Sequence, residues 1–271
     1  MTAHVTSRDG TALAVDTFGH GAPVVLIGGA FNDRSTVAAL GAELAPHFTV
    51  VSYDRRRRGS SGDRAEDYRI AAELDDLAAV LAHVGGRAAV FGHSSGATLA
   101  LDAAAAGLPV DRLAVYEPSF CADPALPRPA ADVYDRLRAL VVAGEREAAT
   151  ELFLGEVIGL PEEAVAGLRK GDGWPFLVDK APSLPYDLLL SEPWRVLPPE
   201  RIAGVRVPTL AAFGDGTSPW LSAATRAVAS TVPGAELHVL PGEDHGILQR
   251  PQALAPLLVT FFSAAPAGPS S

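Results

Sequence analysis

A serine flanked by two glycines is the part of this sequence most suggestive of chemistry. Residues 92–96 read Gly-His-Ser-Ser-Gly and place Ser94 in a G-x-S-x-G pattern. On a sharp turn between a strand and a helix, such a serine presents its hydroxyl as a nucleophile for acyl transfer. The pattern alone is weak in a chain that contains 26 glycines. The elements on either side must therefore decide its meaning.

Both flanking elements have the required character. The run "RAAVF" predicts a strand that ends at Phe91, and "SGATLALDAAAAG" predicts a helix that begins at Ser95. Gly92 and Gly96 have no Cβ, so the turn can lie close to its neighbours. Ser94 would then stand at the carboxyl edge of the sheet, near the positive end of the helix dipole. An ordinary strand-to-helix turn is the competing interpretation.

The wider pattern supplies a sheet for this turn. Short apolar runs alternate with helical patterns through the first 117 residues, which is typical of βαβ units around a mostly parallel sheet. The "DG" at residues 9–10 predicts a hairpin before the parallel part. Strands are expected at residues 13–18, 24–27, 49–53, 88–91 and 113–116, then in the run ending near Phe213 and in "AELHVL". Helices are expected at residues 36–44, 70–84, 95–106, 131–143, 145–158, 219–232 and 251–262.

The middle of the chain departs from this alternation. Prolines become frequent from Pro118, two helical patterns follow, and a tryptophan- and proline-rich irregular stretch precedes the next strand. We therefore expect a mostly helical cap insertion at residues 119–203 over one end of the sheet. Residues 1–118 and 204–263 would form the core, and the apolar-poor segment 264–271 a disordered tail.

Composition narrows the class of protein. The formal net charge of −10 over 271 residues argues against nucleic-acid and anionic-membrane partners. The local exception, Arg55 to Arg58, is interpreted as a solvated turn, balanced by later carboxylates. The one cysteine cannot form an intramolecular disulfide. No basic-then-apolar leader is visible at the start, and a cytoplasmic location is expected.

Several segments in order now resemble the α/β-hydrolase family, in its serine-nucleophile branch. Besides the G-x-S-x-G turn they include "VVLIGGAFNDR", "VVSYDRRRRGSSGD" and "LPGEDHG", and the resemblance extends over residues 10–263. It implies an α/β-hydrolase fold and a hydrolase that needs neither a metal nor an organic cofactor. A serine at position 94 disfavours the haloalkane and epoxide branches, which use an aspartate there.

The resemblance also implies the partners of Ser94. Seven histidines are present, and His245, in the Gly-bracketed loop after the last strand, matches the family's general base. The backbone N–H groups of Ala30 and Ser95 would form the oxyanion hole. Gly28 stands where the family commonly has histidine in a His-Gly pair, so this loop lacks a familiar anchoring side chain.

The acid that orients the histidine has two candidates. The family's usual spacing falls on Thr217, which cannot do this work, and Asp215 lies two positions earlier. Glu117 ends a buried strand, where some family members carry the acid, and a carboxylate there requires a partner. Structural roles compete for both, since Glu117 could cap the insertion's start and Asp215 could brace its turn. The sequence leaves the choice open.

The expected reaction is hydrolysis of an ester or lactone through an acyl-serine intermediate. Phe31, Trp174 and Trp220 could line an apolar site, which suits a medium-sized, largely apolar small molecule, although each could equally be ordinary packing. The alternatives are an acyltransferase, cyclase or C–C hydrolase of the same fold, and a non-catalytic ligand-binding or biosynthetic accessory protein. The sequence does not determine the oligomeric state.

Overall fold

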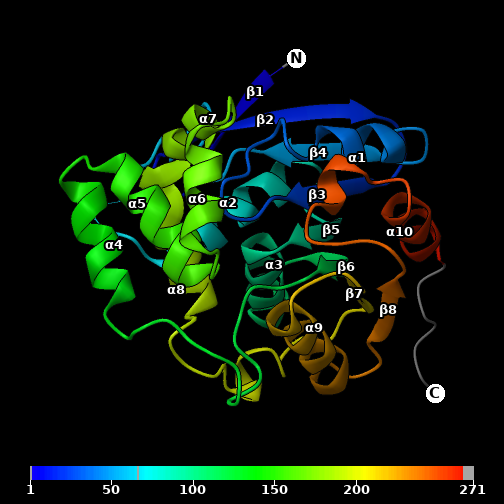
Figure 1. Cartoon of the computed structure of the whole chain (residues 1–271). Coiled ribbons are helices and arrows are strands. Elements are labelled where there is room, and N and C mark those ends of the chain that lie inside the picture. Colours follow the sequence, from blue (N-terminus) through cyan, green and yellow to red (C-terminus); the bar gives the residue numbers. More distant parts are fainter. Residues whose placement is uncertain (1, 66, 265–271) are drawn as a thin grey trace.

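Eight strands form one sheet in the computed structural model, which describes residues 2–65 and 67–264 (Figure 1). They are β1 (Thr2–Thr6), β2 (Ala12–Gly19), β3 (Pro23–Ile27), β4 (Thr49–Tyr53), β5 (Ala88–His93), β6 (Val110–Tyr116), β7 (Thr209–Gly214) and β8 (Glu236–Leu240). Their order is β1-β2-β4-β3-β5-β6-β7-β8. β1 and β2 form the predicted hairpin, β2 also pairs antiparallel with β4, and the remaining neighbours are parallel. The predicted, mostly parallel sheet is confirmed.

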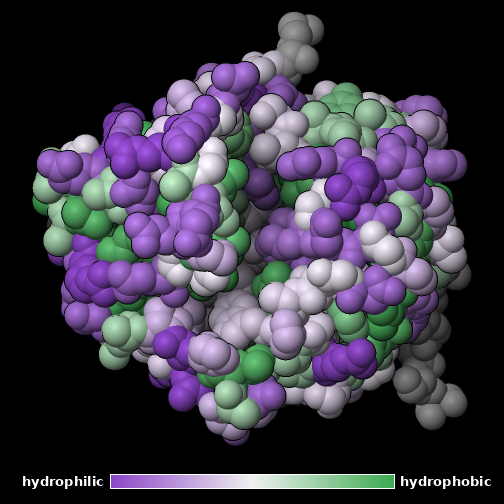
Figure 2. All heavy atoms as spheres, viewed as in Figure 1, coloured by the Kyte–Doolittle hydropathy of each residue, from purple (hydrophilic) through white to green (hydrophobic). Residues whose placement is uncertain are grey.

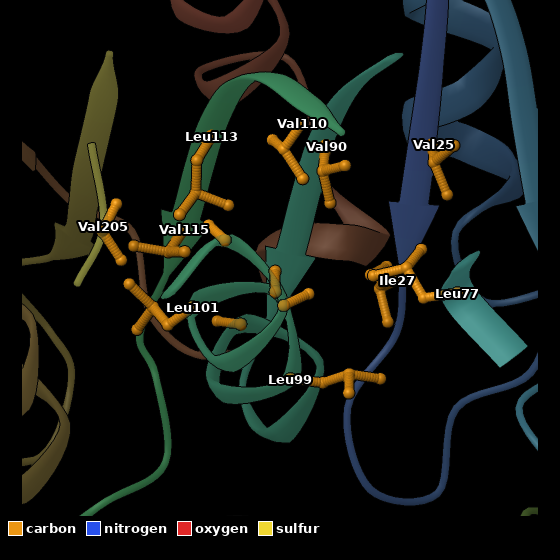
Figure 3. Packing of buried hydrophobic residues seen from close by; sticks show 14 of the residues in the cluster. Val25, Ile27, Leu77, Val90, Leu99, Leu101, Val110, Leu113, Val115 and Val205 are labelled. Atoms are coloured by element: carbon orange, nitrogen blue, oxygen red, sulfur yellow. The ribbon is translucent and has the colours of Figure 1, made fainter. Parts of the chain in front are cut away.

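Helices cover both faces of this sheet. They are α1 (Ala38–Leu44), α2 (Ile70–His83), α3 (Ser95–Ala105), α9 (Pro219–Thr231) and α10 (Leu254–Ser263), with a short 3₁₀ turn at Ile247–Gln249. Alternate strand residues point to opposite faces. In β3, Val25 and Ile27 belong to the cluster with α2, α3 and α9, whereas Val24 and Leu26 pack with α1 and α10. Figure 3 shows the first of these clusters around Val90, Leu99 and Val115.

The segment between β6 and β7 forms the inserted helical region (Figure 1, green). Its helices, which we call the cap, are α4 (Val133–Val142), α5 (Arg146–Leu152), a π-helical turn (Phe153–Val157), α6 (Glu162–Arg169), α7 (Trp174–Lys180), a 3₁₀ turn (Ala181–Ser183) and α8 (Leu184–Ser191); a 3₁₀ turn at Pro199–Arg201 leads back to the core.

The part of the cap predicted to be irregular is helical. Pro175, Pro182 and Pro185 each occupy one of the first two positions of a helix or turn. A proline is tolerated there because its missing N–H would have no partner inside the helix. The proline density therefore marks three helix starts, not an irregular stretch. Of the predicted tail, only Ala264 is among the described residues. No described helix is long and apolar enough to cross a membrane.

Helix α3 lies unusually close to the sheet at its first turn. A Cβ placed on Gly96 would stand 2.5 Å from the carbonyl oxygen of Ile27 and 2.6 Å from that of Gly28. A Cβ on Gly92 would stand 2.5 Å from the Gly96 oxygen. Backbone atoms cannot yield as a flexible side chain can, so both glycines are required for this approach. The local pattern thus sets the position of the whole helix.

We predict that Gly96→Ala destabilises the fold and that Gly167→Ala does not. The new methyl at position 96 would force α3 from β3, at about 1–3 kcal/mol or more. Gly167, inside α6, has nothing within 4 Å of its Cβ direction, so alanine should raise stability by up to about 1 kcal/mol through helix propensity. Urea unfolding of both variants measures the two signs. A neutral Gly96→Ala would contradict the close approach.

Candidate active site

Ser94 occupies a strained turn between β5 and α3. Its φ of 56° and ψ of −125° lie in a region that non-glycine residues seldom adopt, at a cost of about 1–3 kcal/mol. The Ser94 N–H donates to the Tyr116 carbonyl at 3.0 Å, and the Ser94 carbonyl accepts from Ala97 N–H at 2.9 Å. The neighbouring strand and the helix therefore hold this conformation from both sides. The predicted strand–turn–helix context of Ser94 is present.

A buried carboxylate binds His245. The Nδ1 atom of His245 lies 2.6 Å from Oε2 of Glu117, and the Glu117 side chain is fully buried. The other oxygen of Glu117 accepts from Gly214 N–H at 3.0 Å. An ionised carboxylate only accepts hydrogen bonds, so Nδ1 carries the ring proton and Nε2 keeps a free lone pair. The geometry suits a histidine that takes up protons through Nε2.

Asp215, the other candidate acid, has a different partner. Its Oδ1 accepts from Gly242 N–H at 2.7 Å and braces the turn between β7 and β8. Asp244, beside His245, likewise bonds the backbone, here Gly246 N–H at 2.8 Å. The structure thus brings Glu117 to His245 and leaves Asp215 in the bracing role that competed with its catalytic one.

Ser94 and His245 meet through the residue between them. His93 Nε2 lies 3.0 Å from the His245 carbonyl oxygen, and the two imidazole rings have centroids 4.5 Å apart. The hydrogen bonds of the described residues include none between the Ser94 hydroxyl and the His245 ring. Catalytic hydrogen bonds are often long until substrate binds. His93, adjacent to the serine, is a positioning contact that sequence reasoning set aside.

The loop after β3 lies directly against the serine. A Cβ on Gly29 would stand 2.5 Å from Ser94 Cβ and 3.1 Å from its Oγ, so the backbone reaches the nucleophile only because residue 29 is glycine. Asn32 stabilises the loop: its Oδ1 accepts from Gly29 N–H at 2.9 Å, and its own N–H donates to the Gly29 carbonyl at 3.2 Å. Ala30, with its expected oxyanion donor, follows at once.

The four consecutive arginines are the clearest error of the sequence analysis. Arg55, Arg56 and Arg58 are buried, and only Arg57 is partly exposed, so the run is not a solvated turn. Carboxylates distant in sequence neutralise the buried three. They are Glu73 and Asp76 on α2, Asp9 and Asp63 in loops, and Asp187 on α8. A local sequence pattern carries no information about such pairings.

Asp187 reaches from the cap into this arginine cluster. It accepts from Arg55 at 2.9 Å, from Arg58 at 2.7 Å on each oxygen, and from the Ser95 hydroxyl at 2.5 Å. Burial alone would raise the pKa of Asp187, but the adjacent Arg58 and Arg55 outweigh it and hold that pKa below its usual value. A second tie joins Lys180 of α7 to Asp33 of the β3 loop at 3.1 Å. The cap is thus fastened to the core beside Ser94.

The three predicted aromatic residues separate into two groups. Phe31 and Trp174 belong to one apolar cluster with the cap helices, and Phe31 contacts Phe153 edge-on with centroids 5.4 Å apart. Trp220 is half-buried at the start of α9 and is not a member of that cluster. Figure 2 shows a hollow between the cap on the left and the core on the right. Among the described residues no group of three or more histidine, cysteine or acidic side chains could hold a metal.

We predict that His93 makes folding sensitive to mild acid. Burial, reinforced by the adjacent His245 ring, lowers the pKa of His93 well below 6.5. Below pH 6.5 the unfolded chain therefore binds a proton that the folded chain does not, and stability falls by up to about 1.4 kcal/mol per pH unit. Urea unfolding between pH 7.5 and 5 should show a shallower fall for His93→Gln. Equal slopes in both proteins would contradict a neutral His93.

The comparisons with known proteins agree with this geometry. Residues 18–257 match the alpha/beta hydrolase family. The hydrolase YraK of Bacillus subtilis (strain 168) is 37% identical over 87 residues, and the match spans about a third of each chain, 31% of this one and 32% of YraK.

Solved structures resemble the whole fold. An alpha/beta hydrolase from Sphaerobacter thermophilus DSM 20745 is 42% identical, covers 96% of this chain and all of its own, and has a TM-score of 0.89. The enol-lactonase from Burkholderia xenovorans LB400 is 19% identical, with 97% of this chain and all of its own covered and a TM-score of 0.72; it shows the likeness of the fold alone. The matched residues, the sheet order and the strained serine turn together lead to one conclusion: this chain belongs to the alpha/beta hydrolase family.

Proposed function

We propose that the chain is a serine hydrolase that cleaves an ester or lactone of a medium-sized, largely apolar small molecule. The observation that carries the proposal is the buried Glu117 carboxylate bonded to His245 Nδ1 at the sheet edge that holds the strained Ser94 turn. This arrangement supplies a nucleophile, a base and an acid that orients the base. The esterase from Rhodococcus sp. ECU1013 (22% identical) and the enol-lactonase share the fold, which is compatible with either substrate class.

In the first step His245 Nε2 takes the proton of the Ser94 hydroxyl while Oγ attacks the substrate carbonyl. The carbonyl oxygen becomes an oxyanion, which the N–H groups of Ala30 and Ser95 stabilise. Glu117 stabilises the imidazolium that forms, without taking its proton. His245 then protonates the leaving alcohol, and the bond between the carbonyl carbon and that oxygen breaks.

Water completes the cycle. His245 removes a proton from water, which attacks the acyl-serine, and the acid is released as Ser94 regains its proton. In a lactone the leaving alcohol is part of the same molecule as the acyl group, so the product is a single hydroxy acid. The cap cluster that contains Phe31 and Trp174 offers an apolar wall for the acyl chain. This wall favours apolar over charged substrates.

We predict that a fluorophosphonate forms an adduct on Ser94 and that this adduct depends on His245. Mass spectrometry of digests locates the modified serine. His245→Ala should slow labelling by about 10³-fold or more, because the hydroxyl then lacks its base. His238→Ala is the matched control: His238 lies on β8, partly exposed, and its loss should leave labelling unchanged. An adduct confined to another serine would defeat the proposal.

A second prediction separates the two candidate acids. Glu117→Gln preserves the shape of the side chain but removes its charge, and it should lower kcat by about 10³–10⁴-fold on a p-nitrophenyl ester. Asp215→Asn should retain kcat close to that of the parent, because Asp215 bonds only the turn at Gly242. Steady-state kinetics on both variants gives the comparison. Equal and mild effects would exclude both residues as the orienting acid.

A further inference from the structure

Arg58 reaches the backbone of the loop that carries the Ala30 donor. Its guanidinium is buried, and one terminal nitrogen, Nη1, donates to the carbonyl oxygen of Gly29 and to that of Asn32 at 3.3 Å. The other terminal nitrogen, Nη2, donates to both oxygens of Asp187 at 2.7 Å, and Nε donates to Ser183 Oγ at 3.1 Å. Arg58 thus joins the β3 loop to the cap through one rigid, planar group.

The Gly29 carbonyl is significant because of the peptide to which it belongs. Its oxygen and the Ala30 N–H are parts of one planar unit and point in opposite directions in a trans peptide. A guanidinium fixed on the oxygen therefore sets the direction of the Ala30 N–H. A positive charge on the oxygen also polarises the peptide and makes its N–H a stronger donor.

The other expected donor is held by the same carboxylate. Ser95 donates its hydroxyl to Asp187 Oδ1 at 2.5 Å, and Arg55 Nη1 donates to Ser95 Oγ at 3.1 Å and to the Gly28 carbonyl at 3.4 Å. Asp187 therefore lies at the junction of both halves of the hole. Arg55 and Arg58 carry two positive charges, and Glu73 and Asp187 carry two negative charges, so the buried group is neutral overall.

Stability alone is a weak explanation for this network. Burying ion pairs costs desolvation energy that an apolar core would not, and apolar replacements are often neutral or stabilising. We propose that Arg58 and Asp187 are positioning residues that hold the Ala30 and Ser95 amides in place for the oxyanion. The inference rests on the proposed serine hydrolase function. It also assigns an anchor to the loop in which Gly28 replaces the family's histidine.

The test compares Arg58→Met with Arg56→Met. Arg56 is an equally buried arginine that bonds Asp76, Asp63, Asp9 and the Ala72 carbonyl and makes no printed contact with the β3 loop. Three quantities are measured on each: urea unfolding, kcat and KM on a p-nitrophenyl ester, and inhibition by a trifluoromethyl ketone. Ser94 adds to that ketone to give a hemiketal whose oxygen occupies the oxyanion hole.

Both variants should be less stable, but only Arg58→Met should lose catalysis beyond its loss of folded protein. We expect its kcat to fall about 10–100-fold, with KM little changed, because a donor displaced by a fraction of an ångström weakens transition-state binding selectively. The ketone's Ki should rise by a similar factor. Arg56→Met should retain the parent's kcat and Ki. If kcat and Ki of the two variants change alike, or if only KM changes, the positioning role is excluded.

Two gentler variants serve if Arg58→Met fails to fold. Arg58→Lys keeps the charge, but a single ammonium cannot replace the planar fork between Gly29 and Asp187. Ser95→Ala removes the hydroxyl that binds Asp187 and leaves the Ser95 N–H in place. Each should lower kcat and weaken the ketone in the same proportion, and parental values in both would overturn the inference. If the parent itself fails to react at Ser94 with fluorophosphonate, the proposed function fails first.

Discussion

The parallel pairing of β5 with β6 is the constraint on which the site depends. It sets His93 opposite Tyr116, so the next residue of each strand, Ser94 and Glu117, leaves the sheet at the same edge. Both have positive φ, 56° and 49°, and each turns sharply away from its strand. One strand further, β7 supplies the Gly214 N–H to Glu117, and β8 ends before the loop that carries His245. The sheet therefore determines which residues meet.

This constraint explains what could be predicted from the sequence. The strands, the G-x-S-x-G turn and the position of His245 follow from local patterns, since each needs only its own run of residues. The choice between Glu117 and Asp215 could not follow, because it depends on how β6, β7 and β8 are paired. The structure gives Glu117 the histidine and Asp215 a turn N–H. Only a register known in advance would have separated them.

The arginine run failed for a related reason. Four adjacent cations in a chain of net charge −10 look like a surface turn, because the pattern contains no sign of the acids that meet them. Those acids come from α2, from two loops and from α8, up to 129 positions away. Buried charges are stable only when their partners are in place. The cluster therefore forms late in the logic of the fold, once the core and the cap have come together.

That dependence makes the cap part of the site's geometry instead of a detachable cover. Asp187 of α8 and Lys180 of α7 each contribute a charge to the core beside Ser94. Separating the cap would leave Arg58 and Asp33 without these partners, which opposes opening. The strain at Ser94 and Glu117, about 1–3 kcal/mol each, requires surroundings that do not relax. Two apolar faces on the sheet and one neutral charge cluster under the cap together provide such surroundings, and this is why strained residues can persist at the sheet edge.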